Sequence, residues 1–415
     1  MASCPFDFAK ADLSCPAIQE FPYDYYDWLR QCEPVHWDPH LGAFVVTSDA
    51  LVRKAALDWE TFSNVGTRDF GARSEGAAEA AAIRSATHKT QPLTVVLDPP
   101  RHTQYRRIMN QALTQQRMRD SKPWVEELVS GLLASMIAKG GGDFVEEFCI
   151  PLPFAVITRL LGLPATMRDK MREWADSYTE QFKGSISRER EIACALSYVE
   201  YHRFFEALME ERRVMRDPPD DLVTAIALSR LDCGERVGMA DALSLIEQFV
   251  TAGAETTMNA LSMGAHALAT RSDLFARLRD RPDRVETFTE ETLRLFAPAQ
   301  GLFRTVMRDT ELGGVPISKG ARVMLRWGAA NTDSATFADP RIMDLDRANA
   351  RQHVTFGYGI HKCQGSPLAR IELNAAFAGL ARTCTSIAIA PDTGGVEQVH
   401  GIIFMGMKRL PLSMH

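Results

Sequence analysis

The sequence predicts a mainly α-helical fold that also contains small β-sheets. The longest helical pattern runs from Met239 to Thr270, and in a second pattern apolar residues recur at helical spacing from Leu368 to about Arg382. The β-rich runs are short by comparison, such as Val35–Trp37 and Ala43–Thr47. Long helices combined with brief strands are typical of an α+β fold in which helices dominate.

The composition limits the classes of function. The chain has 415 residues, of which 46% are hydrophobic, so it is long enough to bury a large core. A net charge of −6 argues against nucleic acid or an anionic membrane as the main partner. The eight cysteines are too irregularly spaced for a disulfide scaffold or a zinc site, which favours a reducing compartment. Since no signal-peptide pattern and no long apolar stretch is present, we expect a cytoplasmic protein without a membrane anchor.

Near the N-terminus the pattern changes from helix to strand. Aromatic residues are dense between Pro22 and Cys32, where they begin a short amphipathic helix. The two β-rich runs follow, and the segment Asp38–Gly42 between them has the composition of a turn. We expect these elements to form core and sheet edge rather than a binding site.

A loosely patterned segment runs from Val65 to Gln91. It mixes glycine, arginine and serine with an alanine-rich run, and a segment of this length is often a mobile lid. The residues Asp98–Pro100 then interrupt regular structure, and a helix should follow them. On that helix His102 and Arg106, four residues apart, share one face. A cation beside a hydrogen-bond donor suits a carboxylate ligand. The alternative is a surface helix with ordinary solvated charges.

The long central helix carries an unusual group of residues near its middle. Gly253 stands in the helix interior, where glycine costs about 1 kcal/mol relative to alanine. The small residues Ala252 and Gly253 would let a flat ligand approach the backbone, and Glu255 with Thr256 could relay protons. The alternative is that the glycine only allows another helix to pack closely, and that the two polar residues form ordinary hydrogen bonds within the fold.

Glu291 and Arg294 are three residues apart on the next predicted helix, so they can meet on one face. An exposed pair of this kind contributes well under about 1 kcal/mol to the stability of the fold. How strongly this pair acts therefore depends on whether it is buried. The segment Phe296–Pro298 ends the helix. A hairpin from Glu311 to Gly320 and a strand from Arg322 to Arg326 should follow.

The stretch Phe356–Gly365 organises the C-terminal part of the chain. Its three glycines allow a tight turn and a close approach to a flat ligand, and we expect the last, Gly365, to take a positive φ. A helix should follow, because Pro367 suits a first helical position. A helix N-terminus stabilises a thiolate, so Cys363 is a candidate ligand for iron. The alternative is a buried free cysteine in a glycine-rich turn.

The spacing of this stretch, Phe-x-x-Gly-x-His-x-Cys-x-Gly, resembles the haem-binding signature of the cytochrome P450 family. Two stretches upstream resemble other markers of that family, namely its Glu-x-x-Arg motif at Glu291–Arg294 and its oxygen-activating helix at Ala252–Thr257. The resemblance implies a single domain over residues 1–415, with haem b between the long central helix and the helix after the cysteine. It also implies that residues 65–91 form a flexible loop over the substrate pocket.

The resemblance assigns roles to individual residues. Cys363 is implied as the axial thiolate ligand of the haem iron, and Glu255 with Thr256 as the groups that deliver protons. The residues implied to contact the haem are His102, Arg106, Gly253, Arg304, Phe356 and His361. The residues implied to line the substrate pocket are Gln248, Thr251, Ala252, Leu302, Phe303, Ile402 and Ile403. The residues implied to brace the cysteine loop are Glu291, Arg294 and Arg347.

The activity that the resemblance implies is a monooxygenase reaction. Members of the soluble bacterial type receive two electrons from NAD(P)H through a ferredoxin reductase and a ferredoxin, and they use O2 to hydroxylate or O-dealkylate a substrate. The mostly apolar pocket favours a small hydrophobic molecule such as a terpenoid, a steroid or a methoxylated aromatic compound. Lys362, Arg107, Arg351 and Arg370 form either a basic patch for an acidic ferredoxin or ordinary surface charge.

Two other functions stay open at this point. A peroxygenase of the same fold would use hydrogen peroxide and need no ferredoxin. The Glu255–Thr256 pair argues against it, because proton delivery to dioxygen would then be idle. A haem-based sensor would show no turnover, but no stretch of the sequence resembles an appended signalling domain.

Overall fold

The computed structural model describes residues 11–67, 75–89, 91–180, 186–391 and 394–415. The chain divides into two compact units. Unit 1 is drawn from residues 1–67, 122–150 and 256–415, and unit 2 from residues 68–121 and 151–255. Helices α6 (Gln115–Ala138) and α11 (Met239–Thr270) run across the boundaries between these segments. Neither unit is contiguous in sequence, so no single linker separates them.

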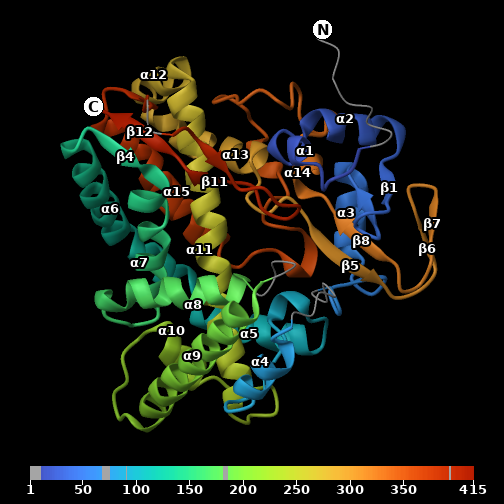
Figure 1. Cartoon of the computed structure of the whole chain (residues 1–415), viewed down its shortest axis with the longest axis vertical. Coiled ribbons are helices and arrows are strands. Elements are labelled where there is room, and N and C mark those ends of the chain that lie inside the picture. The colour runs from blue at the N-terminus through green and yellow to red at the C-terminus, as the bar shows by residue number, and fades with distance from the viewer. Residues whose placement is uncertain (1–10, 68–74, 90, 181–185, 392–393) are drawn as a thin grey trace. The chain divides into compact units, whose positions relative to one another are not determined.

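The main sheet of unit 1 has five strands in the order β1-β2-β8-β5-β3, of which Figure 1 labels β1, β8 and β5. Their bounds are β1 (Val35–Asp38), β2 (Ala43–Val46), β8 (Arg322–Leu325), β5 (Leu302–Val306) and β3 (Phe62–Ser63). The predicted strands near the N-terminus are confirmed as an antiparallel pair, with Val35 opposite Val46. Because β2 pairs in parallel with β8, the sheet joins two distant parts of the chain within unit 1.

Smaller sheets complete unit 1. The predicted hairpin between Glu311 and Gly320 is confirmed as the antiparallel pair β6–β7. The strands of these smaller sheets are β4 (Gly141–Asp143), β6 (Thr310–Leu312), β7 (Val315–Ile317), β9 (Ile387–Ile389), β10 (Glu397–Gln398), β11 (Met407–Arg409) and β12 (Pro411–Met414). β12 lies between β4 and β9, so the C-terminal strand pairs with segments from the middle and the end of the chain.

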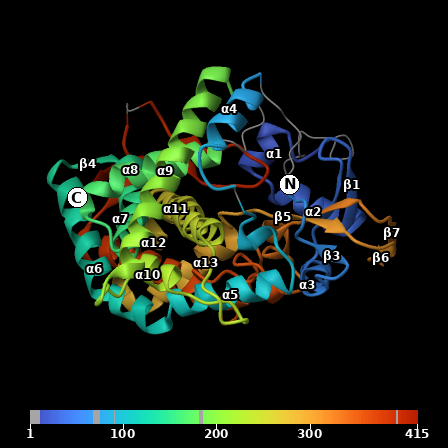
Figure 2. The ribbon, with the colours of Figure 1, turned by 90° about the horizontal axis from the view of Figure 1, so that it is seen from below.

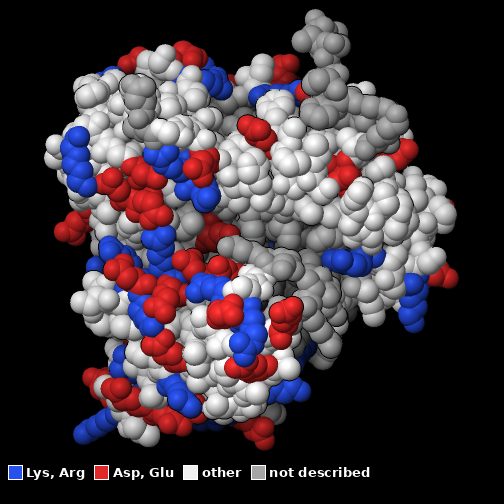
Figure 3. Space-filling view, in the orientation of Figure 1, with Lys and Arg blue, Asp and Glu red and all other residues white. Residues whose placement is uncertain are grey.

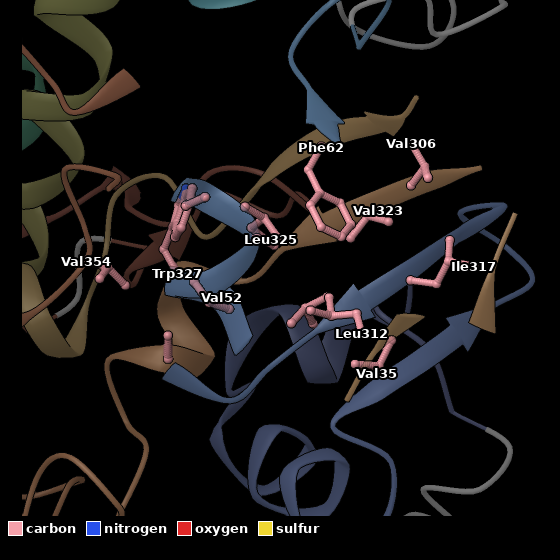
Figure 4. Packing of buried hydrophobic residues seen from close by; sticks show 14 residues of the cluster. Val35, Val52, Phe62, Val306, Leu312, Ile317, Val323, Leu325, Trp327 and Val354 are labelled. Atoms are coloured by element: carbon pink, nitrogen blue, oxygen red, sulfur yellow. The ribbon is translucent and has the colours of Figure 1, made fainter. Parts of the chain in front are cut away.

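A hydrophobic cluster packs against the main sheet (Figure 4). Phe62 of β3, Leu325 of β8 and Val52 of α3 (Asp49–Leu57) point into it, and each is at most 3% exposed. Trp327, which begins the short helix α14 (Trp327–Ala330), is buried in the same cluster. Burial of this apolar surface fixes α3 on the sheet. This matters for the site because the end of α3 contacts the cysteine loop.

The helices of unit 1 follow the predicted patterns. The aromatic segment forms α2 (Tyr23–Cys32), and the helix after the cysteine is α15 (Ser366–Thr383), within one residue of its predicted end. The other helices of this unit are α1 (Pro16–Glu20), α12 (Ser272–Asp280) and α13 (Val285–Leu295). A Cβ at Gly264 of α11 would overlap the ring of Phe377 on α15, so a glycine lets these two helices pack closely.

Unit 2 is helical in the part that the structure describes. Its helices are α4 (Ala77–Arg84), α5 (Arg101–Ala112), α7 (Pro151–Leu160), α8 (Arg168–Glu180), α9 (Arg188–Val214), α10 (Leu222–Ala227) and the first half of α11. Short 3-10 or π segments in the two units are η2 (Thr94–Val96), η3 (Val145–Cys149), η4 (Ala165–Met167), η5 (Pro282–Arg284), η6 (Ala350–Gln352) and η7 (Gly359–His361). The long central helix has the predicted bounds, Met239–Thr270.

The predicted loop at residues 65–91 is partly wrong. Residues 68–74 and 90 lie outside the described part of the chain, but the alanine-rich run forms helix α4 because alanine has the highest helix propensity. Figure 2 shows α4 beside α9, and an ion pair of 2.5 Å joins Glu79 of α4 to Arg188 of α9. His88, which follows α4, lies 2.8 Å from Glu206 of α9. Residues 77–84 of this segment are therefore packed structure within unit 2.

The surface over α8 and α9 carries charges of both signs (Figure 3). Ion pairs such as Lys170 with Glu173, at 3.0 Å, join acidic and basic side chains there. A mixed surface of this kind is typical of helices that face solvent. Within the described residues, no helix has both the length and the apolar composition that crossing a membrane requires.

Candidate active site

The cysteine loop, residues Phe356–Gly365, lies between η6 and α15 in unit 1. The amide of Cys363 donates a hydrogen bond of 2.8 Å to the carbonyl oxygen of Phe356, which closes the loop on itself. Gly359 has a φ of +73°, and a Cβ there would lie 2.6 Å from the carbonyl oxygen of Ala56 on α3. Glycine is required at this position because it adopts a positive φ without strain and leaves room for the α3 backbone.

Gly365 differs from its prediction. Its φ is −76°, in the ordinary right-handed region, so the expected positive φ is wrong. Gly365 is the N-cap of α15, and a Cβ there would lie 3.8 Å from Cys363 Sγ. Its small size therefore keeps one side of the sulfur clear. Cys363 itself is exposed and stands just before the helix N-terminus, as the sequence predicts.

A buried ion network lies behind the loop. The guanidinium of Arg294 donates to both carboxylate oxygens of Glu291, at 2.5 Å and 2.9 Å, and both side chains are fully buried. Arg347 Nε donates to Glu291 Oε2 at 3.0 Å. The structure thus brings together the three residues that the resemblance assigns to bracing. A buried carboxylate that receives several charge-assisted hydrogen bonds holds its partners in one geometry.

This network reaches the cysteine loop through Asn331. Arg294 Nη1 donates to the carbonyl oxygen of Asn331 at 3.0 Å. The side chain of Asn331 accepts from the amide of Val354 and donates to Thr355 Oγ1, both at 2.7 Å. Thr355 Oγ1 in turn donates to the carbonyl oxygen of Leu293 on α13, also at 2.7 Å. The backbone is therefore tied to α13 immediately before the loop begins.

A second buried network, which sequence reasoning missed, surrounds Phe356. Glu290 Oε1 accepts from Arg370 Nε of α15 at 2.6 Å, and Glu290 Oε2 lies 3.0 Å from His353 Nε2. The Arg370 guanidinium lies 4.6 Å from the centre of the Phe356 ring, a cation–π distance. Phe356 is thus fixed by groups from α13 and α15.

The same contacts set the protonation of Glu290. Burial alone would raise the pKa of this carboxyl, but hydrogen bonds from His353 and Arg370 lower its pKa to about 2. Burial lowers the pKa of His353. The available sequence signal is that Glu290 adjoins Glu291 in the predicted motif. No local pattern indicates its partners, which are 63 and 80 residues away.

The basic residues that the resemblance assigns to the haem propionates are distributed over both units. In unit 1, Arg304 is 3% exposed on β5, and His361 ends η7 close to Cys363 in the loop. In unit 2, His102 is buried and Arg106 is half-buried on α5. Their spacing places them on one face of that helix, as predicted.

Helix α11 is buried over most of its length but is exposed at Ala252 and Gly253. Among the described residues, no atom lies within 4 Å of the position that a Cβ at Gly253 would take, so the backbone there adjoins open space. Glu255 and Thr256 follow within the next helical turn and are half-buried. Helix α11 therefore presents a small-residue opening directly before an acid–alcohol pair.

The residues assigned to the substrate pocket fall into two groups. In unit 2, Gln248 and Thr251 are on α11 beside the exposed Ala252. In unit 1, Phe303 is only 7% exposed within an apolar cluster, against which Ile402 and Ile403 also pack. Leu302 of β5 packs against the cluster shown in Figure 4. The structure thus brings Phe303, Ile402 and Ile403 together, with Phe303 largely part of the core.

Comparison with known proteins identifies the family. A family model described as cytochrome P450 matches residues 190–388. Cytochrome P450 107B1 of Saccharopolyspora erythraea is 30% identical over 377 residues, which cover 90% of this chain and 89% of that protein. The chain belongs to the cytochrome P450 family. Another relative, the linalool 8-monooxygenase of Pseudomonas putida, is 30% identical over 378 residues, which cover 89% of this chain and 90% of the relative.

The fold agrees with this membership. The solved structure of cytochrome P450 CYP109Q5 from Chondromyces apiculatus matches with a TM-score of 0.84 and 26% identity over 98% of both chains. The cytochrome P450 family uses haem with a cysteine thiolate as the axial ligand. As a cytochrome P450 with relatives named as monooxygenases, the protein is a monooxygenase.

The residues of this cytochrome P450 fit a haem. Cys363 offers an exposed thiol on a closed loop, and Gly365 leaves space beside the sulfur. Arg304 and His361 are cations or hydrogen-bond donors from the same unit, as the carboxylates of a haem require. The donor set of one thiol and several basic groups therefore matches the chemistry of this cofactor.

Proposed function

We propose that this cytochrome P450 hydroxylates or O-dealkylates a small hydrophobic molecule with O2 and two electrons from NAD(P)H, delivered through a ferredoxin reductase and a ferredoxin. The observation that carries the proposal is the exposed Cys363 thiol on a closed, braced loop directly before α15. Relatives are named as a steroid C26-monooxygenase, a linalool 8-monooxygenase and a vitamin D(3) 25-hydroxylase, which supports a terpenoid or steroid substrate. The irregular cysteine spacing supports a cytoplasmic location.

In this proposal Cys363 ligates the haem iron as a thiolate. The haem supplies the binding and reductive activation of dioxygen. Arg304 and His361 of unit 1 would hold the propionates, and the same role for His102 and Arg106 of α5 stays a prediction from the sequence. Phe356, whose ring centre lies 4.6 Å from the Arg370 guanidinium, stands at the start of the ligand loop and would contact the haem.

Glu255 and Thr256 deliver protons in this proposal. The hydroxyl of Thr256 holds the proton that leaves for dioxygen, and Glu255, which is half-buried, exchanges protons with solvent and restores it. Gly253 provides the space next to the helix backbone. Thr256→Ala should therefore retain haem and consume reductant, but release most of the electrons as hydrogen peroxide. The measurement is the ratio of product formed to NAD(P)H consumed. An unchanged ratio would contradict the role of Thr256 in proton delivery.

The proposed ferredoxin patch is less basic than the sequence suggests. Arg370 binds the buried Glu290, Arg351 pairs with Glu286 at 3.0 Å, and Arg107 in unit 2 pairs with Asp232. In unit 1, Lys362, Arg351 and Arg370 line a polar cavity of about 260 Å³ next to the cysteine loop. An acidic side chain of a ferredoxin fits the charge of this cavity, and salt should weaken the association.

The first experiment is the absorption difference spectrum of the reduced protein with carbon monoxide. A thiolate opposite the carbon monoxide should move the main absorption band strongly to the red, and Cys363→Ser should abolish this band. Cys32→Ser removes another exposed cysteine of unit 1 and is the matched control, which should keep the band. A histidine-like band, or folded protein without haem, would overturn the proposed ligand.

The same preparation separates the other candidate functions. Hydrogen peroxide in place of reductant and ferredoxin should give little product if Glu255 and Thr256 serve dioxygen activation. Efficient turnover with peroxide alone would favour a peroxygenase. The absence of product from a panel of terpenoids, steroids and methoxylated aromatics, with reductant and a compatible ferredoxin, would favour a haem-based sensor.

A further inference from the structure

The guanidinium of Arg326 is buried in unit 1 without a carboxylate partner. Arg326 stands directly between β8 and α14 and is 2% exposed, and no acidic side chain in the described part of the chain forms an ion pair with it. Its amide donates a hydrogen bond of 3.0 Å to the carbonyl oxygen of Val46 on β2, which fixes the base of the side chain to the main sheet. An apolar side chain would fill the same space without the cost of burying a charge. The hydrogen bonds of the guanidinium are therefore what distinguishes arginine at this position.

Two groups accept hydrogen bonds from this guanidinium. Arg326 Nη1 donates to the carbonyl oxygen of Ile402. Arg326 Nε donates at 2.7 Å to the hydroxyl of Tyr26 on α2. The guanidinium also lies 5.3 Å from the centre of the Tyr26 ring, a cation–π distance. Because charge-assisted hydrogen bonds are stronger than those between neutral groups, Arg326 connects Ile402 firmly to α2 and to the main sheet.

The network continues from Tyr26 to Gln300. The Tyr26 hydroxyl donates to Gln300 Oε1 at 2.8 Å, and Gln300 is itself only 2% exposed. A Cβ at Gly328 would overlap Gln300 Oε1, so a glycine leaves the room that this side chain occupies. The amide of Gln300 donates to the carbonyl oxygen of Ile403 at 2.6 Å. Arg326 and Gln300 therefore hold two successive carbonyl groups.

Both carbonyl groups belong to a half-buried segment between β10 and β11, residues Gly401–Phe404, which we call the apolar tip. The tip makes one isolated β-bridge, to Ala299, and is otherwise outside the helices and strands. Ile402 and Ile403 pack against the cluster that contains Phe303, and the resemblance assigns all three to the substrate pocket. The tip thus lacks the regular hydrogen bonds of a sheet, and the side-chain network supplies others.

We propose that Arg326 is a specificity-determining positioning residue, which holds the apolar tip so that Ile402 and Ile403 form a fixed wall of the substrate pocket. A fixed wall discriminates between hydrophobic molecules by their shape, because a molecule that overlaps it must displace packed side chains. A mobile tip adapts to molecules of different shape and discriminates less. The inference rests on the proposed function, which includes the place of the two isoleucines in the pocket.

The test measures the binding of azoles to the haem-loaded full-length protein, because an azole nitrogen ligates iron and changes the haem spectrum. The probes are the two enantiomers of econazole, the two enantiomers of bifonazole, and imidazole. Enantiomers are equally hydrophobic and carry the same ligating group, so a difference in their affinities reports the shape of the pocket. In at least one pair the affinities for the wild type should differ about tenfold, and Arg326→Met should reduce this ratio to less than about threefold. Imidazole is too small to depend on a wall, so its affinity should change less than about twofold.

Two further variants show whether Arg326 acts through the tip. Tyr26→Phe removes the hydroxyl that joins the guanidinium to Gln300, so it should also lower the ratio, by a smaller factor. Ile402→Ala removes part of the wall itself. If Arg326 acts by holding Ile402, the double variant of Arg326→Met and Ile402→Ala should lose no more of the ratio than the more affected single variant. Additive losses would show that Arg326 acts elsewhere and would overturn the positioning role.

Tyr25→Phe is the matched control for Tyr26→Phe. Tyr25 is the neighbouring residue of α2 and is 1% exposed, but its hydroxyl donates to the carbonyl oxygen of Ala11 at 3.1 Å, outside the network. This variant should keep the wild-type ratio. The positioning role is overturned if the wild type binds both enantiomers of each pair equally, if Arg326→Met keeps the wild-type ratio, or if the control lowers the ratio as much as Tyr26→Phe.

The carbon monoxide spectrum of each variant separates these outcomes from a failure of the proposed function. A red-shifted band together with an unchanged ratio in Arg326→Met overturns the positioning role alone. A wild-type protein without that band overturns the proposed function itself. A variant that keeps the band has kept its folded haem site, so its lower ratio does not come from unfolding. If Arg326→Met lost the band, Tyr26→Phe would decide the question in its place.

Discussion

The cysteine loop of unit 1 and the helices α4, α8 and α9 of unit 2 are held by ion pairs of different character. Behind the loop, Glu291 and Arg294 are both 0% exposed and share two hydrogen bonds. Between α4 and α9, Glu79 and Arg188 are 47% and 51% exposed. Loss of one partner from a buried pair leaves an uncompensated charge in a medium of low polarity, whereas water screens an exposed pair.

The contrast between buried and exposed ion pairs indicates that the surroundings of the cysteine loop are the more rigid region. A ligand loop must present its sulfur in one geometry, and the buried networks of Glu291 and Glu290 connect it to α13 and α15. Helices joined by exposed pairs can separate locally at little cost in free energy. We therefore expect substitutions around the loop to affect stability and haem retention together, and those between α4 and α9 to affect neither strongly.

The largest effect is expected for Glu291→Gln. It leaves the buried guanidinium of Arg294 without its counter-charge, and the free energy of unfolding should fall by about 3–5 kcal/mol. Denaturant unfolding and the haem-to-protein ratio measure the effect. Glu286→Gln is the matched control, because Glu286 is 70% exposed in its pair with Arg351. Equal stability of the two variants would show that the buried network does not brace the loop.

The second network should give a pH-dependent effect. The pKa of Glu290 is lowered from 4.5 to about 2, so its ionised form stabilises the fold above pH 4.5, and this stabilisation is lost as the pH falls toward 2. Its contribution is at most about 3 kcal/mol. The difference in unfolding free energy between wild type and Glu290→Gln should therefore be largest at neutral pH and shrink in acid. A difference that stays constant from pH 6 to pH 3 would contradict the assignment.

Two glycines of the loop allow a finer comparison. Gly359→Ala places a Cβ at a φ of +73° and 2.6 Å from the Ala56 carbonyl oxygen, so it should destabilise the fold by about 1–3 kcal/mol. Gly365→Ala has an ordinary φ of −76° and a Cβ 3.8 Å from the sulfur, so its unfolding midpoint should barely change. Thermal unfolding of both variants is the measurement. The reverse order would mean that the sulfur side of the loop is more constrained than its turn.

The smallest effect is expected for Glu79→Gln in unit 2. The pair with Arg188 is half-exposed, so its loss should change the unfolding free energy by less than about 1 kcal/mol, and added salt should reduce the difference further. Denaturant unfolding at low and high ionic strength measures this. If this variant lost as much unfolding free energy as Glu291→Gln, the exposed pair would stabilise the fold as strongly as the buried pair, which would contradict the comparison.

Local sequence signals predicted several elements well. The bounds of α11 and the start of α15 follow from helical periodicity and from the glycine and proline near Cys363. The alanine run at residues 77–82 lies in a segment for which the sequence predicts a loop, yet alanine favours helix, and packing against α9 stabilises α4. At Gly365 the sequence predicts a positive φ, whereas the structure has a negative one. A glycine near a cysteine is compatible with either reason for its presence, a positive φ or the absence of a side chain.

Local residue patterns are enough to establish that a cysteine stands before a helix and that Glu291 and Arg294 share a helical face, because such features depend on residues within one or two turns of each other. Packing between distant elements brings Glu290 to His353 and Arg370, and brings Ser197, Tyr201 and Glu247 to one cavity. These contacts join segments far apart in the chain. Their formation depends on how whole elements pack, which no local pattern encodes.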